Sequence, residues 1–172
     1  MLRVRKVGLI TDNNSLFDPK AVFVTDETDR NKIFKAVYEE LYVLGYVKKD
    51  FINNLMDREQ KYPTGVSTRP LSRELPNVAI PHTEGKYVNK RLIVPVGLKH
   101  PISFNNMVNP SENFKVKFLF ILLNKDPKTH SNMLAKIMDF LAATPVKDLK
   151  ELFNSTDPNY IYDFLENNFN NN

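Results

Sequence analysis

Six bulky apolar residues stand in a row at Phe118–Leu123 and leave few options for the fold. A helix or strand with one face in water would place polar residues at intervals, and this run has none. The pattern is typical of a strand buried on both faces, which requires a covering layer on each side of its sheet. The run is also too short to cross a membrane, because a spanning helix needs roughly 20 apolar residues.

Two further apolar runs in the middle of the chain predict strands. Val78–Ile80 is short and is halted by Pro81. Leu92–Leu98 is longer but contains Pro95, which has no backbone N–H to donate to a neighbouring strand. We therefore expect the second strand to lie at an edge of the sheet or to carry a bulge.

Helices are predicted in the first third of the chain. Four apolar residues follow the three-to-four spacing of an amphipathic helix: Ile33, Val37, Leu41 and Leu44. Gly45 lies where a C-terminal cap would be. Asp50 is placed as the N-cap of a second helix, which should end near Lys61, before Pro63.

The last third of the chain returns to helical spacing. One predicted helix begins around Pro127 and carries four apolar residues on one face: Leu134, Ile137, Met138 and Leu141. Thr144-Pro145 and Asp157-Pro158 each place a capping residue before a proline, and both should open helices. Helices at both ends around a few central strands predict an α/β fold, one small sheet with helices packed on its faces.

The organisation of the chain favours one domain over residues 1–172. Its 172 residues can bury a sizeable core, and no repeat or Pro- or Gly-rich linker divides them. We expect the folded core to cover about residues 20–166 and the asparagine-rich tail, 167–172, to fray. The basic N-terminus is not followed by an apolar stretch, so no signal peptide is expected. The chain has no cysteine, which suits a cytoplasmic protein and excludes disulfides, thiol catalysis and thiolate metal sites.

The positive charge does not predict nucleic-acid binding. The net charge is +4, and the basic residues form short scattered groups without a dense tract or an aromatic–basic RNA motif. A mildly basic solvated surface is the better interpretation.

Several common chemistries are excluded by residue spacing. The five glycines lie far apart, so the chain contains neither a phosphate-binding P-loop nor a dinucleotide fingerprint. No serine stands in a G-x-S-x-G elbow. His82, Glu84 and His130 could supply metal ligands, but no His-Glu-x-x-His pair or second carboxylate completes a site, so we expect no metal and no cofactor.

Three histidines remain as candidates for chemistry. His82 is the first residue beyond the strand Val78–Ile80 and Pro81, at the kind of strand end where ligands meet α/β sheets. From spacing alone it is equally well a half-buried histidine satisfied by backbone groups. His130 lies near the N-terminus of a predicted helix, where a neutral imidazole could lie beside an anion or be an incidental polar residue. His100 is expected at the surface.

Two segments in combination resemble a known family. They are Arg58–Gly65, with an Arg-Glu pair and a Thr-Gly turn, and Asn77–Glu84, with Ala-Ile-Pro-His. They are similar to the enzyme IIA domain of the phosphoenolpyruvate-dependent sugar phosphotransferase system (PTS), fructose–mannitol type. The Pro-Thr-Gly turn and the Ile80–Glu84 segment are closest to the galactitol branch. Asn77 departs from the family, which often has glycine there, and the segment between Gly65 and Asn77 is longer and more charged than in compact members.

The resemblance implies a phosphotransferase component with a covalent phosphohistidine. The family fold is a small mixed sheet with helices on both faces. His82 would be the phosphorylated nucleophile, on Nε2, with Arg58 stabilising the phosphoryl oxygens. His130 would be a second histidine near the phosphate, and Thr64 could donate its hydroxyl in substrate binding. Glu84 would be structural or would contact a partner.

The resemblance also implies the partners. The phosphocarrier protein HPr would be the donor, a IIB component the acceptor, and a IIC permease would act downstream in uptake of a sugar or sugar alcohol. Domains of this family also act as phosphorylation-sensitive regulators that bind other proteins without feeding a transporter. The regulatory function therefore remains the alternative.

Overall fold

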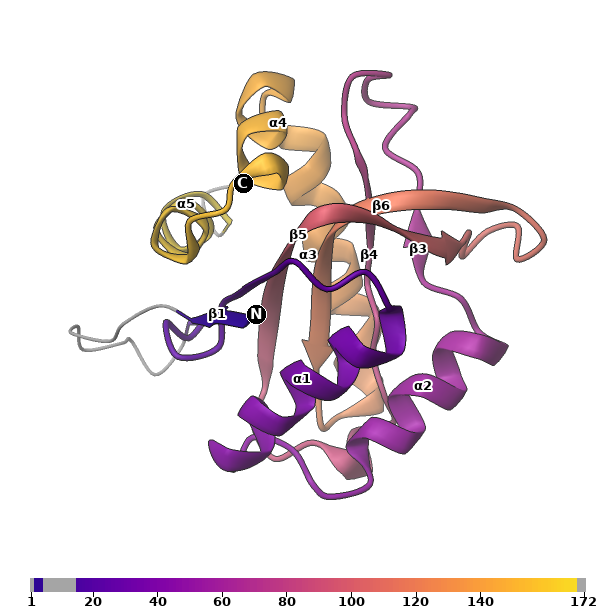
Figure 1. Cartoon of the computed structure of the whole chain (residues 1–172), viewed down its shortest axis with the longest axis vertical. Coiled ribbons are helices and arrows are strands. Elements are labelled where there is room, and N and C mark those ends of the chain that lie inside the picture. The colour runs from indigo at the N-terminus through magenta and orange to yellow at the C-terminus, as the bar shows by residue number, and fades with distance from the viewer. Residues whose placement is uncertain (1, 5–14, 170–172) are drawn as a thin grey trace.

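A computed structural model describes residues 2–4 and 15–169, which are built around one six-stranded sheet (Figure 1). The strand order is β1-β2-β5-β6-β4-β3. The strands are β1 (Leu2–Val4), β2 (Phe23–Thr25), β3 (Gly65–Val66), β4 (Asn77–Ala79), β5 (Leu92–Asn105) and β6 (Asn113–Leu123). β2 and β5 are parallel, as are β4 and β6, whereas the other three pairs are antiparallel. The sheet is therefore mixed, as the resemblance implied.

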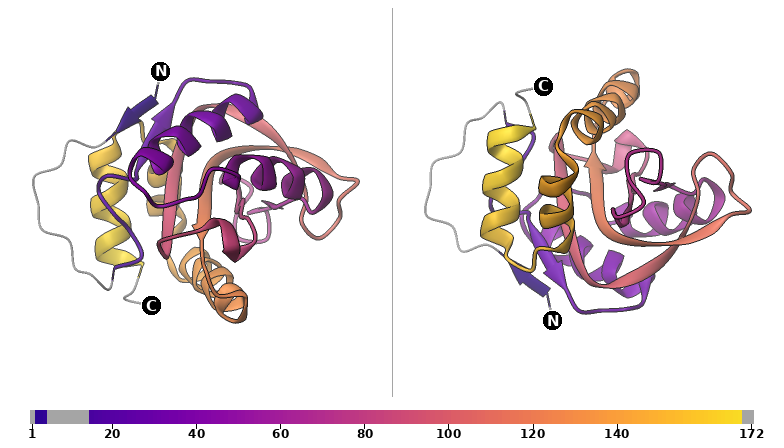
Figure 2. Two further views of the ribbon diagram at one scale, coloured as in Figure 1. Left: turned by 90° about the horizontal axis from the view of Figure 1, so that it is seen from below. Right: turned by 90° about the horizontal axis from the view of Figure 1, so that it is seen from above.

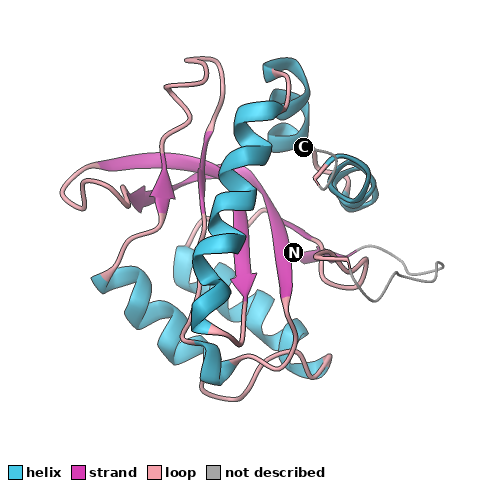
Figure 3. Ribbon diagram, turned by 180° about the vertical axis from the view of Figure 1, so that it is seen from behind, coloured by secondary structure: helices cyan, strands magenta, loops and turns pink. Residues whose placement is uncertain are grey.

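Helices cover both faces of the sheet. They are α1 (Arg30–Val43), α2 (Phe51–Lys61), α3 (His130–Ala143), α4 (Val146–Asn154) and α5 (Pro158–Asn168). α1 and α2 pack on one face and share an apolar cluster with the strands, whereas α3, α4 and α5 share the cluster on the other face. Figure 2 shows α1 and α2 on the opposite side of the strands from α3, and Figure 3 shows α3 lying across the sheet. Two short 3₁₀ turns, Gly85–Tyr87 and Pro127–Thr129, complete the described elements. The predicted α/β fold with helices on both faces is confirmed.

β6 is the central strand that the apolar run predicts. It lies between β5 and β4, and every residue of Phe118–Leu123 is at most 1% exposed. Alternate side chains enter the two apolar clusters, Phe118 on one face and Leu119 on the other. The absence of polar residues in this run follows from burial on both faces.

The expected edge position of the strand with Pro95 is wrong. β5 lies between β2 and β6, and Pro95 pairs with Phe120 in the antiparallel ladder. The amide of Ile93, two residues earlier, points away from β6 and donates to the Leu16 carbonyl. The nitrogen of Pro95 faces the same way, where the ladder to β2 starts only at Val96, so the missing donor costs no ladder bond. The strand does change register, but between Gly97 and Ile102.

The predicted helix ends are confirmed in part, and α3 begins at His130, three residues after the expected Pro127. Gly45 follows α1 with φ +77°, and Asp157 caps α5 by accepting the Asn159 amide. Asp50 precedes α2 without a side-chain capping bond. Thr144 was expected to cap α4, which is wrong: its hydroxyl donates to the Phe140 carbonyl at the end of α3.

The predicted fraying of the tail is wrong for residues 167–169, and 170–172 lie outside the described residues. α5 continues to Asn168, and Phe169 is 4% exposed. Its ring packs edge-on against Phe17 at 5.0 Å between centroids and lies 5.2 Å from the ring of Phe140. The core also begins earlier than expected, because Leu16 and Phe17 are buried.

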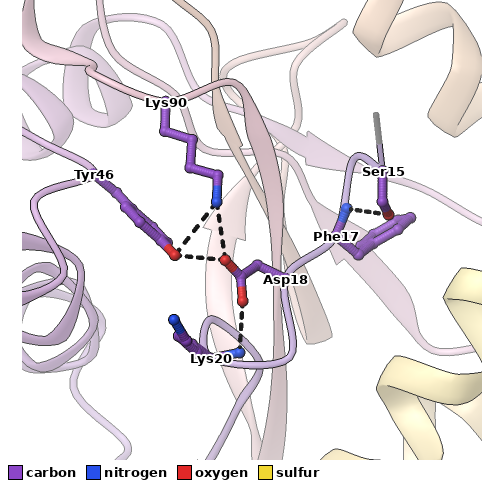
Figure 4. Close-up of polar contacts among 6 residues, drawn as sticks. All are labelled: Ser15, Phe17, Asp18, Lys20, Tyr46 and Lys90. Atoms are coloured by element: carbon purple, nitrogen blue, oxygen red, sulfur yellow. Dashed lines mark hydrogen bonds and ion pairs between the residues drawn. The ribbon is translucent and has the colours of Figure 1, made fainter. Parts of the chain in front are cut away.

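The buried carboxylate of Asp18 connects three segments of the chain. Asp18 is 5% exposed and accepts hydrogen bonds from the Tyr46 hydroxyl, the Lys90 ammonium at 3.0 Å and the Lys20 amide at 2.9 Å (Figure 4). We call these four residues the Asp18 cluster. Tyr46 follows α1 and Lys90 precedes β5, so the cluster joins the chain before β2 to both.

No helix in the described part of the chain is long and apolar enough to cross a membrane.

Candidate functional site

His82 lies beside the end of the central strand. It follows β4 through Ile80 and Pro81 and forms a bridge with Leu122 of β6. The Leu122 amide donates to the Pro81 carbonyl at 2.9 Å, which holds the segment on the β6 side. Pro81 fixes its own φ and favours an extended Ile80. The sequence therefore places His82 just beyond the end of β4, on a backbone whose conformation is restricted.

The His82 ring is held by a backbone carbonyl. Its Nδ1 lies 2.9 Å from the Ile80 oxygen. A carbonyl oxygen can only accept, so Nδ1 carries a proton in this contact. In the neutral ring, Nε2 then holds the lone pair. The side chain is half-buried. Both interpretations from the sequence therefore describe part of it: the ring bonds to a backbone group, and it lies at a strand end of the kind where ligands bind.

His82 lines a cavity of about 530 Å³, which we call the polar cavity because most of its lining residues are polar or charged. Its lining residues come from α2, from the segment after β4 and from the turn before α3: Arg58, His82, Thr83, Glu84, Gly85, Lys86 and Pro127. Arg58 is on the last turn of α2, and its guanidinium lies over the Tyr62 ring at 5.4 Å. No hydrogen bond or ion pair holds that guanidinium within the described part of the chain. The structure thus brings the predicted Arg58 and His82 to one cavity.

Glu84 and Lys86 offset each other at the rim of this cavity. The Lys86 ammonium lies 3.4 Å from the Glu84 carboxylate, and the Glu84 amide donates to Asn54 of α2. Both side chains are exposed. Lys86 is therefore paired with Glu84. Arg58, the other cation in the lining, has no carboxylate partner among the described residues.

Gly85 allows the loop before α3 to approach this cavity closely. A Cβ at Gly85 would lie 2.1 Å from the Lys125 carbonyl oxygen. The contact is between two backbone segments, so a side chain here would push away the loop that carries Pro127.

His82 also lines a second, mainly apolar cavity of about 370 Å³. Its lining is drawn from four parts of the chain: Lys61, Tyr62, Pro63, Thr64, His82, Met107, Pro110 and Leu134. Tyr62 is 64% exposed, and Val108, next to Met107, is 91% exposed. Exposed apolar residues around a polar centre are typical of a surface that contacts a partner protein.

His130 is the first residue of α3, and its side chain lies outside the described residues. Pro127, three residues earlier, lines the polar cavity, and Leu134, four residues later, lines the apolar one. The start of α3 therefore lies beside His82. The predicted role of the His130 side chain stays a prediction.

Thr64 is bound to a carboxylate from α2. Glu59 is 3% exposed, and its Oε1 accepts the Thr64 amide at 3.0 Å while its Oε2 accepts the Thr64 hydroxyl at 2.6 Å. Thr64 is itself 3% exposed, so its hydroxyl serves Glu59 in this structure. Its predicted contact with substrate stays a prediction.

Burial raises the pKa of Glu59 to about 7. The two bonds from Thr64 and the more distant charge of Arg30 act in the opposite direction but do not outweigh desolvation. Within the described residues, no lysine or arginine lies within ion-pair distance of this carboxylate. Glu59 therefore holds its proton at a higher pH than an exposed glutamate does.

Glu59 is a site residue that sequence reasoning missed. The signal was its spacing: it follows the buried Phe51 and Leu55 at four-residue intervals along α2. A carboxylate that continues an apolar helix stripe must find buried donors. The sequence analysis also missed Lys86 and the apolar residues that line the second cavity at His82. They lie mainly in loops, and the approach of those loops to His82 depends on the tertiary fold.

Comparison with known proteins identifies relatives. The family model described as "Phosphoenolpyruvate-dependent sugar phosphotransferase system, EIIA 2" matches residues 15–168. The transcriptional regulator ManR of Bacillus subtilis (strain 168) is 26% identical over 129 residues. That match covers 74% of this chain but only 18% of ManR.

Two solved structures from Escherichia coli share the fold. The crystal structure of IIA mannitol has a TM-score of 0.67 at 15% identity, over 87% of this chain and 98% of that one. The IIA mannitol domain in complex with phosphorylated IIB mannitol has a TM-score of 0.64 at 15% identity, over 84% and 93%.

Proposed function

Because this chain belongs to the EIIA 2 family of the phosphoenolpyruvate-dependent sugar phosphotransferase system, we propose that it carries a phosphoryl group on His82. A phosphotransfer role follows from the family. The observation that supports His82 as the carrier is its ring geometry: Nδ1 bonds to the Ile80 carbonyl at the junction of two cavities. One cavity is polar and contains an arginine, and the other is apolar.

Phosphoryl transfer at His82 needs no external acid or base. The lone pair of Nε2 attacks phosphorus on the donor's phosphohistidine, so one P–N bond forms as another breaks. The proton stays on Nδ1, hydrogen-bonded to the Ile80 carbonyl, throughout. Since the transition state is loose, positioning and charge stabilisation contribute most of the rate.

Arg58 provides the charge that this transition state requires. Its guanidinium can donate two parallel hydrogen bonds to phosphoryl oxygens from the wall of the polar cavity. Backbone N–H groups at the start of α3, with His130, complete the anion pocket in this proposal. We expect His130→Ala to slow transfer and Arg58→Lys to lose much of the rate, because an ammonium cannot donate in the same paired geometry.

The proposed partners are HPr as donor and a IIB component as acceptor, upstream of a IIC permease. The fold neighbour in complex with phosphorylated IIB mannitol supports a IIB acceptor. The apolar cavity with Tyr62 and Met107 provides a contact surface beside His82. The transported molecule is a sugar or sugar alcohol, and the Pro63–Gly65 turn favours the galactitol type among them.

A regulatory function is the second candidate, supported by the similarity to ManR. On that function His82 would still accept phosphate, but the group would change the binding of another protein instead of passing to IIB. Transfer from the phosphorylated chain to cognate IIB distinguishes the two candidates.

Intact-mass spectrometry at alkaline pH tests the proposal. The chain is incubated with phosphoenolpyruvate, enzyme I and HPr, beside His82→Ala and the matched control His100→Ala. His100 is exposed on β5 and lines none of the cavities around His82. We expect an acid-labile gain of one phosphate in the wild type and His100→Ala and none in His82→Ala. Equal gain in all three would place the phosphate elsewhere.

A further inference from the structure

We propose that Glu59 is a positioning residue for His82, acting through Thr64 and Ile80. The proposal rests on the proposed function of His82 as the phosphoryl carrier. Glu59 does not line either cavity at His82, so its effect must pass through the backbone between them.

The first link joins α2 to the turn before β3. Both carboxylate oxygens of Glu59 accept from the same residue, one from the Thr64 amide and the other from its hydroxyl. Two bonds to one residue fix its backbone and its side-chain rotamer together. Because Glu59 and Thr64 are each 3% exposed, water cannot replace either bond without opening the core.

The second link joins that turn to the segment carrying His82. The Thr64 carbonyl accepts the Ile80 amide at 3.0 Å, which extends the β3–β4 ladder by one residue. Ile80 then contacts the His82 Nδ1 through its own carbonyl at 2.9 Å. The orientation of that carbonyl depends on the backbone of Ile80, which Thr64 holds on one side and Pro81 restricts on the other.

The last turn of α2 therefore contributes two residues to the site. Arg58 extends into the polar cavity, while the adjacent Glu59 extends into the core and holds the backbone behind His82. Moving the turn that Glu59 holds would move the acceptor of Nδ1. The ring would then lose its preference for the tautomer with the lone pair on Nε2.

Nitrogen-15 NMR of the His82 ring tests this positioning directly, with phosphate uptake from HPr as the second measurement. The test variants are Glu59→Leu and Thr64→Val, with Thr64→Ser as the conservative rescue. Asp18→Asn is the matched control, because Asp18 is a buried carboxylate that contacts neither cavity at His82.

We expect Glu59→Leu, which removes both bonds to Thr64, to give a mixture of the two neutral tautomers and to slow phosphate uptake by about tenfold, as a displaced reacting group would. Thr64→Val should show a smaller change in the same direction, because it keeps the amide bond to Glu59. Thr64→Ser and Asp18→Asn should resemble the wild type in both measurements. If Glu59→Leu does not fold, Thr64→Val tests the same connection.

The proposal is overturned if folded Glu59→Leu or Thr64→Val keeps a pure Nδ1–H ring and the wild-type rate. A change of equal size in Asp18→Asn would also overturn it, because the effect would then reflect general destabilisation. If the wild type takes no phosphate from active HPr, the proposed function fails. The ring tautomer still tests the positioning in that case.

Discussion

Asp18 and Glu59 are both almost fully buried carboxylates, yet their pKa values move in opposite directions. Burial raises both, but for Asp18 the hydrogen bonds from Tyr46, the Lys20 amide and Lys90 outweigh it, so the pKa lies below its ordinary value. Glu59 has donors from a single neutral residue, and burial raises its pKa to about 7. The larger set of donors at Asp18, led by the Tyr46 hydroxyl and including the Lys90 ammonium, separates the two pKa values.

The two carboxylates also connect different parts of the molecule. The Asp18 cluster joins the chain before β2 to the segments that follow α1 and precede β5, and none of its four residues lines a cavity at His82. Glu59 joins α2 to the turn that supports the segment carrying His82. We therefore expect changes at Asp18 to lower stability and changes at Glu59 to alter the site.

The largest expected difference is in the pH dependence of stability. The folded pKa of Glu59, about 7, exceeds its ordinary value of 4.5, so the folded state holds a proton that the unfolded state releases. The free energy of unfolding should therefore fall by about 3 kcal/mol as pH rises from 4.5 to above 7. Arg30, the charge that faces Glu59 from α1, lowers the pKa of Glu59 by less than burial raises it.

Urea unfolding between pH 5 and 8 measures this fall, with Glu59→Gln beside the wild type. The variant should lack the slope because its amide does not titrate. Asp18 has the opposite sign, since its stabilisation is lost only as pH falls through its lowered folded pKa. Parallel curves for the wild type and Glu59→Gln would contradict the assignment.

The next effect is the loss of the Asp18 charge. Asp18→Asn should lower the free energy of unfolding by about 2 kcal/mol at pH 7, because its bond with Lys90 is charge-assisted. Lys90→Gln should cost less, since the lysine side chain is 44% exposed and can be hydrated. Both variants should accept phosphate at the normal rate. Slower uptake in Asp18→Asn would show that the two regions are coupled.

The contrast also explains what the sequence could predict. Phe118–Leu123 identified its strand because burial on both faces leaves a local pattern, and Ile80-Pro81-His82 identified a strand end. The central position of Pro95 depended on where β2 begins to pair, which no local pattern records. Glu59 needed the pairing of β3 with β4 before its link to His82 existed. Local patterns thus predicted the elements and the position of His82 at a strand end, whereas the contacts that support His82 required the tertiary fold.

A third effect concerns packing behind the site. Gly85→Ala should cost about 1.5 kcal/mol, because its Cβ would overlap the Lys125 carbonyl and displace the loop before α3. Phosphate uptake should slow with it. Gly45→Ala is the matched control: it is strained by φ +77° but has nothing within 4 Å of the new Cβ and lies away from His82. Equal rates in the two variants would mean that the loop position does not affect transfer.

The smallest expected effect distinguishes the contribution of Tyr46, the neutral side chain that donates to Asp18, from that of Lys90, the charged one. Tyr46→Phe removes one hydrogen bond and should cost about 1 kcal/mol at pH 7, while Lys90 continues to hold the carboxylate. The pKa of Asp18 should then move upward, because the Tyr46 hydroxyl lowers it in the wild type. Stability will therefore start to fall at a higher pH on acidification, and the deficit against the wild type should shrink once Asp18 is protonated in both proteins. Urea unfolding from pH 7 to 3 measures that convergence, and a deficit that stays constant to pH 3 would assign the role of Tyr46 to packing of its ring.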